Sequence, residues 1–595
     1  MSKILNNKKT FKVFCAILIS LVFVYLQEVQ LTWSVWTHSL NFKALHIVLV
    51  NMLVVGVLYL FIYCISRKLH ITVLVSSVVV TILSLVNYHV YAYHGTPFFA
   101  GDIYSITTAI GVVGQYKFLI CLQTVCLLVI FVFELFLWLI IFFVFKFTFE
   151  KSSIKPLLLM LGIDISAVYC IFFSSFTPFP SSLIQWSWKT AVNEYGYSVC
   201  LCNSFYTLGH TINEPDGYDP NLVSAPEPCD NANNKPDIIV ILNESLYDLD
   251  VYADVPESRE LFIEIEEIED IKNGSSVVSL IGGGTNNTEY ELLTSNSMEM
   301  LNSSAPFAAM SMKNADSIVS YLKRIGYVTS AMHCCNAENY SRNRAYPDLG
   351  FDEVYLDKEY FKIVNNNGSR KWLDIDNYYE MLNFYNEMGD KPRFMYLLTM
   401  QNHGGYEQND SSFDTVIAEG DYGEHDDDVD EFLSSIRLSV DAIKFLIENL
   451  KTSQRDTVVL IVGDHAPSFI SSLKPKDDLE GIEADIAQKT VPYYIWSNFD
   501  MNEEVLQKYT TVYDLLPMTL KAAGIKTSSY YENILELNKY YPIRTASGTY
   551  MDSEGNYGYI NESIPNYELI RNYRYMQYNR ITKKSDYKSE WFETN

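Results

Sequence analysis

Five long apolar stretches within the first 175 residues constrain this 595-residue chain more than any other feature. A helix needs about 20 apolar residues to cross the hydrocarbon of a bilayer. We therefore predict a membrane domain of five helices over residues 1–175. The first stretch is expected to remain as an anchor, because it is long for a signal peptide and no small-residue cleavage pattern follows it. The stretches cover roughly residues 12–33, 44–65, 70–93, 119–145 and 156–175.

The distribution of charge predicts the orientation of the chain in the membrane. Residues 1–200 hold 12 Lys/Arg and 6 Asp/Glu, whereas the remaining residues hold 32 and 65. Basic residues precede the first stretch and lie between the second and third and between the fourth and fifth. Because basic loops stay in the cytoplasm, we predict a multi-pass cell-membrane protein with a cytoplasmic amino terminus. The acidic part after the fifth span is then extracellular, and we expect no nucleic-acid partner.

Composition divides the rest of the chain into three segments. Residues 176–234 mix aromatics with Pro, Gly and Asn, which predicts an interfacial linker. Over residues 235–525, apolar strand candidates alternate with helical patterns, which predicts an α/β fold with a mainly parallel sheet between helices. Residues 526–595 are rich in Tyr and Asn and predict a small antiparallel element. The strand candidates are 237–243, 276–281, 327–333, 393–400, 457–463 and 491–496.

Two of these apolar runs end in residues that can bind a metal ion. Glu244 follows the first run, and Asp464 and His465 follow the run at 457–463. In open α/β sheets the ligand site lies beyond the carboxyl ends of the strands. The two strand ends therefore predict one shared site. Either signal alone is weak, because a strand-end Asp-His is often just a hydrogen-bonded turn.

A threonine between these runs in the sequence supplies a candidate nucleophile. Thr285 follows three glycines, Gly282 to Gly284, and precedes a helical pattern at residues 287–300. A threonine hydroxyl is a weak nucleophile at neutral pH and needs a neighbouring base or a metal ion. The glycines allow close backbone approach, and the following helix would direct its amino end at an anion. We predict a metal-activated Thr285.

The motifs around these residues resemble a known family. The chain resembles the lipoteichoic acid synthase family, whose members are sulfatase-like proteins of the alkaline phosphatase superfamily. Five spans followed by an exported domain are also similar to that family. The motifs are Asn243-Glu244-Ser245, Gly283-Gly284-Thr285-Asn286-Asn287-Thr288-Glu289-Tyr290-Glu291, Thr399-Met400-Gln401-Asn402-His403-Gly404 and Gly463-Asp464-His465-Ala466-Pro467.

The resemblance implies roles for individual residues. Thr285 matches the nucleophile and also contacts the metal, while the other metal ligands match Glu244, Asp464 and His465. His403 matches a residue that binds the glycerol phosphate group. In the segment Asn339-Tyr340-Ser341-Arg342, Arg342 is placed on the phosphate and Tyr340 takes the place of a tryptophan, still offering an aromatic wall. Arg344 competes for the Arg342 role, since a shift of two residues in the match would exchange them.

The resemblance also implies a reaction. It predicts a metal-dependent transferase that moves glycerol phosphate from a phosphatidylglycerol-like lipid to a glycolipid, teichoic acid or surface glycan through a covalent threonine intermediate. Manganese is the expected ion, with magnesium as the alternative and zinc still allowed by the ligands. One alternative is a phosphoethanolamine transferase or a phosphodiesterase on the same scaffold. Another is an inactive membrane scaffold or sensor.

Some residues are left open by the sequence. Trp372, Asp374 and Asp376 fit a pocket rim and an ordinary surface equally well. External cysteines, five in number, could form one or two disulfides, with no readable connectivity. They are Cys200, Cys202, Cys229, Cys334 and Cys335.

Overall fold

A computed structural model describes residues 8–34, 45–94, 97–100, 121–144, 153–173, 188–210, 212–229, 234–301, 305–357, 360–361, 372–387, 389–404, 406 and 416–593. The chain divides into two compact units. The first runs to Thr211 and includes Ala308–Ser311 and Glu338–Ser341, and the second contains the rest from Ile212 onward. The parts of the predicted linker at 176–187 and 230–233 lie outside the described residues.

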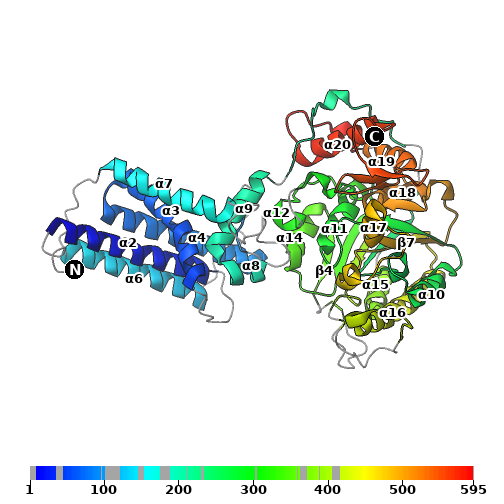
Figure 1. Ribbon diagram of the computed structural model, residues 1–595, viewed down its shortest axis with the longest axis horizontal. Coiled ribbons are helices and arrows are strands. Elements are labelled where there is room, and N and C mark those ends of the chain that lie inside the picture. The colour runs from blue at the N-terminus through cyan, green and yellow to red at the C-terminus, as the bar shows by residue number, and fades with distance from the viewer. Residues whose placement is uncertain are drawn as a thin grey trace. The chain divides into compact units, whose positions relative to one another are not determined.

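Long apolar helices that run side by side build the first unit (Figure 1). Many of their apolar side chains are exposed, among them Ile65 and Val132, as expected for surfaces that contact lipid. Within the described residues, four helices are long and apolar enough to cross a membrane, which confirms four of the five predicted apolar helices as candidate spans. The fifth, α7, is a 20-residue helix that carries Lys155 and Asp164 and is not among these four. The helices are α2 (Lys8–Trp33), α3 (Leu45–Ser66), α4 (Leu69–His94), α6 (Leu122–Val144) and α7 (Ile154–Phe173).

Two further helices occupy part of the segment predicted as a linker. These are α8 (Trp188–Tyr195) and α9 (Tyr197–His210). Asn51 of α3 forms a hydrogen bond with each of them. Its Nδ2 donates to the Tyr195 carbonyl oxygen at 2.7 Å, and its Oδ1 accepts from the Val199 amide at 3.0 Å. This stretch is therefore a helical part of the first unit.

An eight-stranded sheet, counted over the described residues, forms the centre of the second unit, in the order β4-β3-β5-β1-β6-β7-β2-β8. Strand β7 is antiparallel to both of its neighbours, and the other pairs are parallel. Every residue of β1, β5 and β6 is buried, as expected for strands covered on both faces. The predicted mainly parallel α/β sheet is confirmed. The strands are β1 (Asp237–Asn243), β2 (Ile271–Val277), β3 (Val328–His333), β4 (Glu353–Leu356), β5 (Arg393–Leu398), β6 (Thr457–Gly463), β7 (Thr490–Ser497) and β8 (Tyr509–Thr511).

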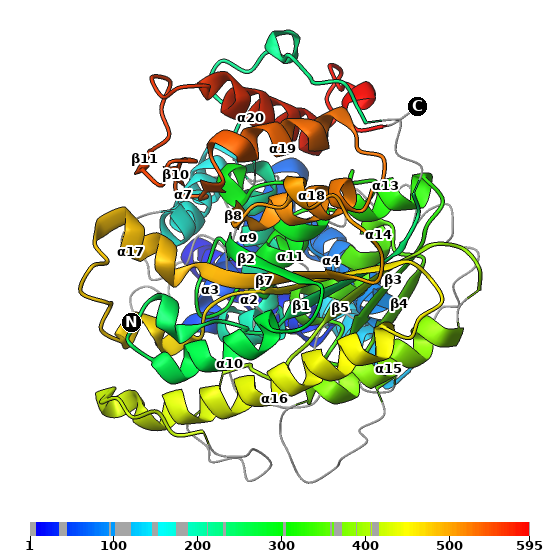
Figure 2. The ribbon, with the colours of Figure 1, turned by 90° about the vertical axis from the view of Figure 1, so that its right-hand side faces the viewer.

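Helices cover both faces of this sheet (Figure 2). One face carries α10 (Pro256–Glu266), α15 (Asp374–Glu387) and α16 (Asp426–Leu450). The other carries α11 (Thr285–Thr294), α18 (Leu515–Ala522), α19 (Ser529–Tyr540) and α20 (Tyr567–Thr582). Shorter helices are α12 (Pro306–Ala309), α13 (Ile318–Arg324), α14 (Arg342–Leu349) and α17 (Gly481–Gln488).

A separate small sheet confirms the predicted carboxyl-terminal antiparallel element. It consists of β9 (Ile543–Arg544), β10 (Thr549–Met551) and β11 (Tyr557–Tyr559), with β10 antiparallel to both neighbours. Ile543 and Met551 bury their side chains in one apolar cluster with Val277 of β2 and Ile486 of α17. The small sheet is thereby packed against the main domain.

Two boundaries near the glycine run were predicted wrongly. The strand expected at 276–281 is β2, Ile271–Val277, whose sequence is mostly polar because several of its side chains are only half-buried. The apolar residues that suggested the later strand, such as the exposed Leu280, lead into the loop. The helix expected at 287–300 begins earlier, so Thr285 is the first residue of α11.

Candidate functional site

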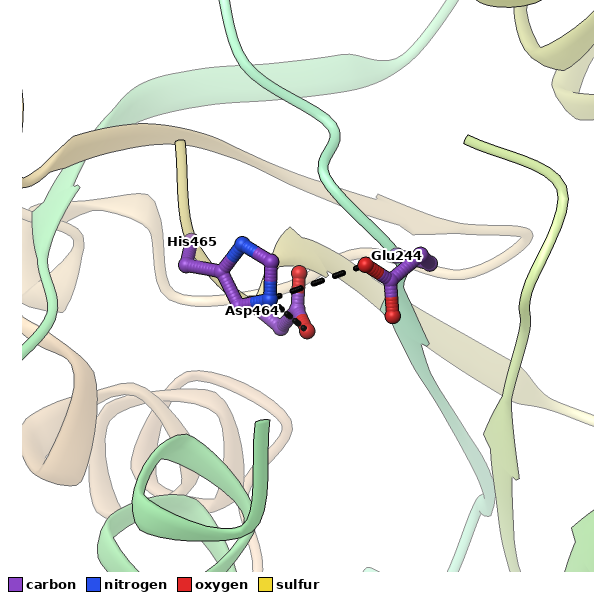
Figure 3. Close-up of side chains that lie close together, drawn as sticks. All are labelled: Glu244, Asp464 and His465. Atoms are coloured by element: carbon purple, nitrogen blue, oxygen red, sulfur yellow. Dashed lines mark ion pairs between the residues drawn. The ribbon is translucent and has the colours of Figure 1, made fainter. Parts of the chain in front are cut away.

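Three predicted metal ligands converge at the ends of β1 and β6. The two strands are parallel and pair Asn243 with Gly463, so that the residues that follow them emerge side by side. The potential ligand atoms of Glu244, Asp464 and His465 all lie within 4.8 Å of one another. Figure 3 shows the imidazole directed at both carboxylates: Nε2 is 3.2 Å from Asp464 Oδ2 and 3.6 Å from Glu244 Oε1.

Local backbone features hold the two strand ends together. A side chain at Gly463 would collide with the carbonyl oxygen of Leu246, so only glycine fits there. Ser245 adopts φ 46°, a left-handed conformation that is unusual for a residue with a side chain. In that conformation its amide donates to Asp464 Oδ1 at 2.7 Å, and its hydroxyl donates to Glu244 Oε1 at 3.0 Å. The turn after β1 therefore orients both carboxylates.

The electrostatics of this cluster favour a bound cation. All three side chains are buried, and among the described residues neither carboxylate forms an ion pair with a lysine or arginine. Burial, together with the charge of Glu244, raises the pKa of Asp464 to about 6. Burial lowers the pKa of His465, but the two carboxylates outweigh it and the net shift is upward. Two buried carboxylates with no lysine or arginine partner carry negative charge that a divalent ion compensates.

The imidazole tautomer also fits a metal ligand. His465 Nδ1 lies 2.9 Å from the carbonyl oxygen of Ala466, which can only accept, so Nδ1 carries the hydrogen in the neutral ring. Nε2 then presents its lone pair to the space shared with the carboxylates. Two carboxylates and one imidazole suit manganese, magnesium or zinc, so the residues present fit the predicted ion without selecting one.

Thr285 stands beside this cluster at the start of α11. Gly282, Gly283 and Gly284 have φ of 65°, 138° and 79°, which produces the sharp turn into the helix. The Gly282 amide donates to the Ala466 carbonyl at 2.9 Å, which holds the loop against the end of β6. The Thr285 hydroxyl lies near enough to Asp464 to lower the pKa of that carboxyl, against the larger effect of burial. The predicted nucleophile and metal ligands thus meet at one place.

Arg342 reaches the same helix from α14 through a buried ion pair. Its Nε and Nη2 donate to Glu289 Oε2 at 2.9 and 2.7 Å. Glu289 lies one turn after Thr285, and its other oxygen accepts from the hydroxyls of Tyr346 and Tyr396. Burial lowers the pKa of Arg342, but the charge and hydrogen bonds of Glu289 together with Tyr346 and Tyr396 raise it by more, so the guanidinium stays charged. The predicted contact of Arg342 with phosphate remains a prediction.

The other predicted substrate residues lie outside the buried cluster. His403 follows β5, the neighbour of β1, and its side chain is exposed, with Nδ1 3.3 Å from the Gly404 carbonyl oxygen. Tyr340 has φ 53° and belongs to the short stretch that groups with the first unit. Arg344 donates to the Phe307 carbonyl oxygen at 2.8 Å and so differs from Arg342, which is tied to α11. The substrate roles of His403 and Tyr340 remain predictions.

A buried polar network below the site was missed by sequence reasoning. Asp374, at the start of α15, is fully buried, and its Oδ2 accepts from Asn243 Nδ2 at 3.0 Å and from Ser439 Oγ at 2.7 Å. Its amide donates to Gln401 Oε1 at 2.9 Å. Burial raises the pKa of Asp374 to about 6. Asp374 therefore joins the residue before Glu244 to the loop before His403, and is neither pocket rim nor surface. An aspartate in the first turn of a helix was the available signal.

The fold and the site define an α/β domain with a buried carboxylate and imidazole cluster beside a threonine. The model of the family described as Sulfatase matches residues 236–525. This part of the chain is a Sulfatase-family domain, which confirms the sulfatase-like resemblance.

Individual proteins are similar over larger parts of the chain. A protein of Rhizobium meliloti (strain 1021), assigned provisionally to cyclic beta-1,2-glucan modification, is 25% identical over 404 residues, which cover 64% of this chain and 61% of that protein. The chain thus spans about three-fifths of that relative's length. Among solved structures, the phosphoglycerol transferase GacH of Streptococcus pyogenes in complex with sn-glycerol-1-phosphate has 20% identity and a TM-score of 0.48, covering 65% of this chain and all of that one. Lipoteichoic acid synthase LtaP of Listeria monocytogenes has 14% identity and a TM-score of 0.41, covering 63% and 96%.

Proposed function

We propose that this chain is a membrane-anchored phosphoglycerol transferase. It takes glycerol phosphate from a phosphatidylglycerol-like lipid and passes it to a cell-surface acceptor, a teichoic acid, glycolipid or glycan. The observation that carries the proposal is the position of Thr285 at the amino end of α11, beside the buried cluster of Glu244, Asp464 and His465. The motif resemblance to lipoteichoic acid synthases supports the lipid donor, and the four apolar helices support a membrane anchor.

The chemistry is two successive transfers at phosphorus. Thr285 Oγ1 forms a bond to phosphorus, the bond to the diacylglycerol oxygen breaks, and the proton lost by the threonine ends on diacylglycerol. An acceptor hydroxyl then attacks the same phosphorus, its proton ends on Thr285, and the glycerol phosphate leaves with the acceptor. A divalent cation on Glu244, Asp464 and His465, manganese or magnesium, would supply positive charge beside the threonine hydroxyl.

The surrounding residues prepare this reaction. The positive amino end of the α11 dipole and the Arg342 guanidinium stabilise negative charge that develops on the phosphoryl oxygens. We assign binding of the glycerol headgroup to His403, which follows β5 and is exposed. A glycan acceptor is favoured by the relative assigned to cyclic beta-1,2-glucan modification. The basic residues that flank the apolar helices favour the cytoplasmic side, which orients the Sulfatase-family domain to the outside of the cell.

The test uses the full-length protein in detergent with radiolabelled phosphatidylglycerol and Mn²⁺. We expect release of diacylglycerol, and its loss in Thr285→Ala. Thr582→Ala is the matched control, because Thr582 lies at the end of α20 and donates only to the Tyr578 carbonyl within that helix. Release from phosphatidylethanolamine alone would establish the phosphoethanolamine alternative. A properly folded protein that releases diacylglycerol from neither lipid would overturn the proposal in favour of the scaffold.

A further inference from the structure

Two adjacent cysteines lie at the carboxyl end of β3. Cys334 and Cys335 directly follow the last residue of the strand, and their Sγ atoms are 4.0 Å apart. Cys334 is buried and Cys335 is partly exposed, so the pair can be approached from the Cys335 side. Strand β3 is separated from β1 only by β5 and runs parallel to both. The thiols therefore lie at the carboxyl ends of the parallel strands, on the same side of the sheet as Glu244.

The geometry of the pair suits two thiols on one ion better than a disulfide. Adjacent Cα atoms are about 3.8 Å apart, whereas disulfide-linked residues usually have Cα atoms about 4.4–6.8 Å apart. Both cysteines are free thiols in the structure. Two thiolates bound tetrahedrally to one ion at about 2.3 Å lie about 3.8 Å from each other. The observed 4.0 Å between Sγ atoms is close to that separation.

The surroundings favour the thiolate that such an ion needs. The hydrogen bond from Cys334 and the positive charge of Arg342 lower the pKa of Cys335, although burial, Glu244 and Asp357 act against them. Burial raises the pKa of Cys334, so Cys335 ionises first. The influence of Glu244 on Cys335 also places the pair within electrostatic range of the predicted metal cluster.

We propose that Cys334 and Cys335 form a two-thiol binding site for one thiophilic species, such as Cd²⁺ or a trivalent arsenical. This site is separate from the cluster of Glu244, Asp464 and His465, whose oxygen and imidazole donors suit manganese or magnesium. Soft ions would select the two thiols and hard ions the carboxylates.

The first test uses phenylarsine oxide with the full-length protein in detergent, under a phosphine reductant. Two As–S bonds form, the arsenic-bound oxygen leaves as water with both thiol protons, and no oxidation state changes. We expect a cysteine-containing peptide spanning both residues to carry one phenylarsine by mass spectrometry, with the adduct removed by a dithiol but not by a monothiol. Cys335→Ser, at the partly exposed position, should lose this stable adduct, while the control Cys229→Ser should keep it.

A second measurement follows Cd²⁺ titration through the ultraviolet absorption of cadmium–thiolate bonds. We expect one strong site in the unmodified protein and in Cys229→Ser, and at least a tenfold weaker site in Cys335→Ser. A peptide that never takes up the arsenical, or a Cys335→Ser variant with unchanged cadmium affinity, overturns the two-thiol site. Neither readout depends on lipid turnover, so failure here is distinguishable from failure of the transferase proposal.

Discussion

The hydroxyl of Thr288 donates to the backbone carbonyl oxygen of Asp464 at 2.7 Å. This buried hydrogen bond links the first turn of α11, which begins with the proposed nucleophile, to the residue that supplies a proposed metal ligand. Thr288, which is neither the proposed nucleophile nor a proposed metal ligand, therefore helps to fix the position of Thr285 relative to Asp464. A nucleophile must be held accurately at its target, because small displacements at a reacting centre are costly.

Thr288→Val should reduce lipid turnover without removing the metal site. The substitution keeps the shape but deletes the hydroxyl, which leaves the Asp464 carbonyl without this donor and costs about 1–3 kcal/mol. We expect kcat to fall roughly tenfold or more while Mn²⁺ affinity stays within about twofold. Thr288→Ser, which keeps the donor, should retain most activity. Equal losses in both variants would show that the hydrogen bond is not what matters.

Asp374→Ala should weaken metal binding, because Asp374 supports the residue that precedes Glu244. The change leaves one N–H of Asn243 without its acceptor, at about 1–3 kcal/mol, and leaves the Ser439 hydroxyl only its longer contact with Asn402 Oδ1 at 3.3 Å. Because Asn243 precedes Glu244, we expect Mn²⁺ affinity to fall roughly 10–100-fold, as for other residues that orient ligands. Isothermal titration measures this, and Asp374→Asn should recover part of it. Asp376→Ala, at a less buried neighbouring position, is the control.

Glu291 should make the stability of the protein depend on pH. Burial raises its folded pKa from 4.5 to about 7, so the folded state holds a proton more tightly than the unfolded state. Its contribution to stability is fully present below pH 4.5 and is lost as the pH rises through 7, by up to about 3 kcal/mol. Thermal unfolding from pH 5 to 8 should show a flatter profile in Glu291→Gln. Parallel profiles for the two proteins would contradict the assignment.

Manganese should stabilise the folded protein. A cation on the buried cluster compensates the negative charge of two carboxylates that have no lysine or arginine partner, and binding only the folded state adds about 2.7 kcal/mol at a hundredfold excess over Kd. We expect a higher unfolding temperature with Mn²⁺, reversed by EDTA. His465→Ala should abolish the shift, whereas His425→Ala, whose imidazole pairs with Asp428, should not. A shift that survives His465→Ala would place the ion elsewhere.

Arg342 and Arg344 have different hydrogen-bond partners, so substitutions should distinguish their roles. Arg342→Lys keeps the charge but cannot keep both hydrogen bonds to Glu289, so we expect turnover to fall at least tenfold through loss of the planar guanidinium. Arg344→Lys changes a contact with the Phe307 carbonyl and should alter turnover by less than about twofold. Initial rates of diacylglycerol release compare the two. The reverse order would assign the phosphate contact to Arg344.

Elements with a strong local signal were predictable from the sequence. The runs at 237–243 and 457–463 were predicted with the bounds of β1 and β6, because fully buried parallel strands are continuously apolar. Four membrane helices were predictable for a similar reason, since the length and hydrophobicity of a spanning helix are local properties. Strand β2 was misplaced, and the short strands β4 and β8 were missed, because their residues are polar or partly exposed and their pairing partners are distant in sequence.

The sequence by itself determined which residues could do chemistry: Glu244, Thr285, Asp464 and His465 each follow a strand or a glycine turn that local patterns reveal. Only the tertiary structure decided how they meet. The pairing of Asn243 with Gly463, the left-handed Ser245 and the bond from Thr288 to Asp464 are contacts between segments far apart in the chain. The same holds for Asp374, whose local sequence fits a pocket rim and a surface equally well but whose burial is set by the packing of α15 and α16 under the sheet. Periodicity reports the environment of one segment, whereas a site is fixed by contacts among several segments.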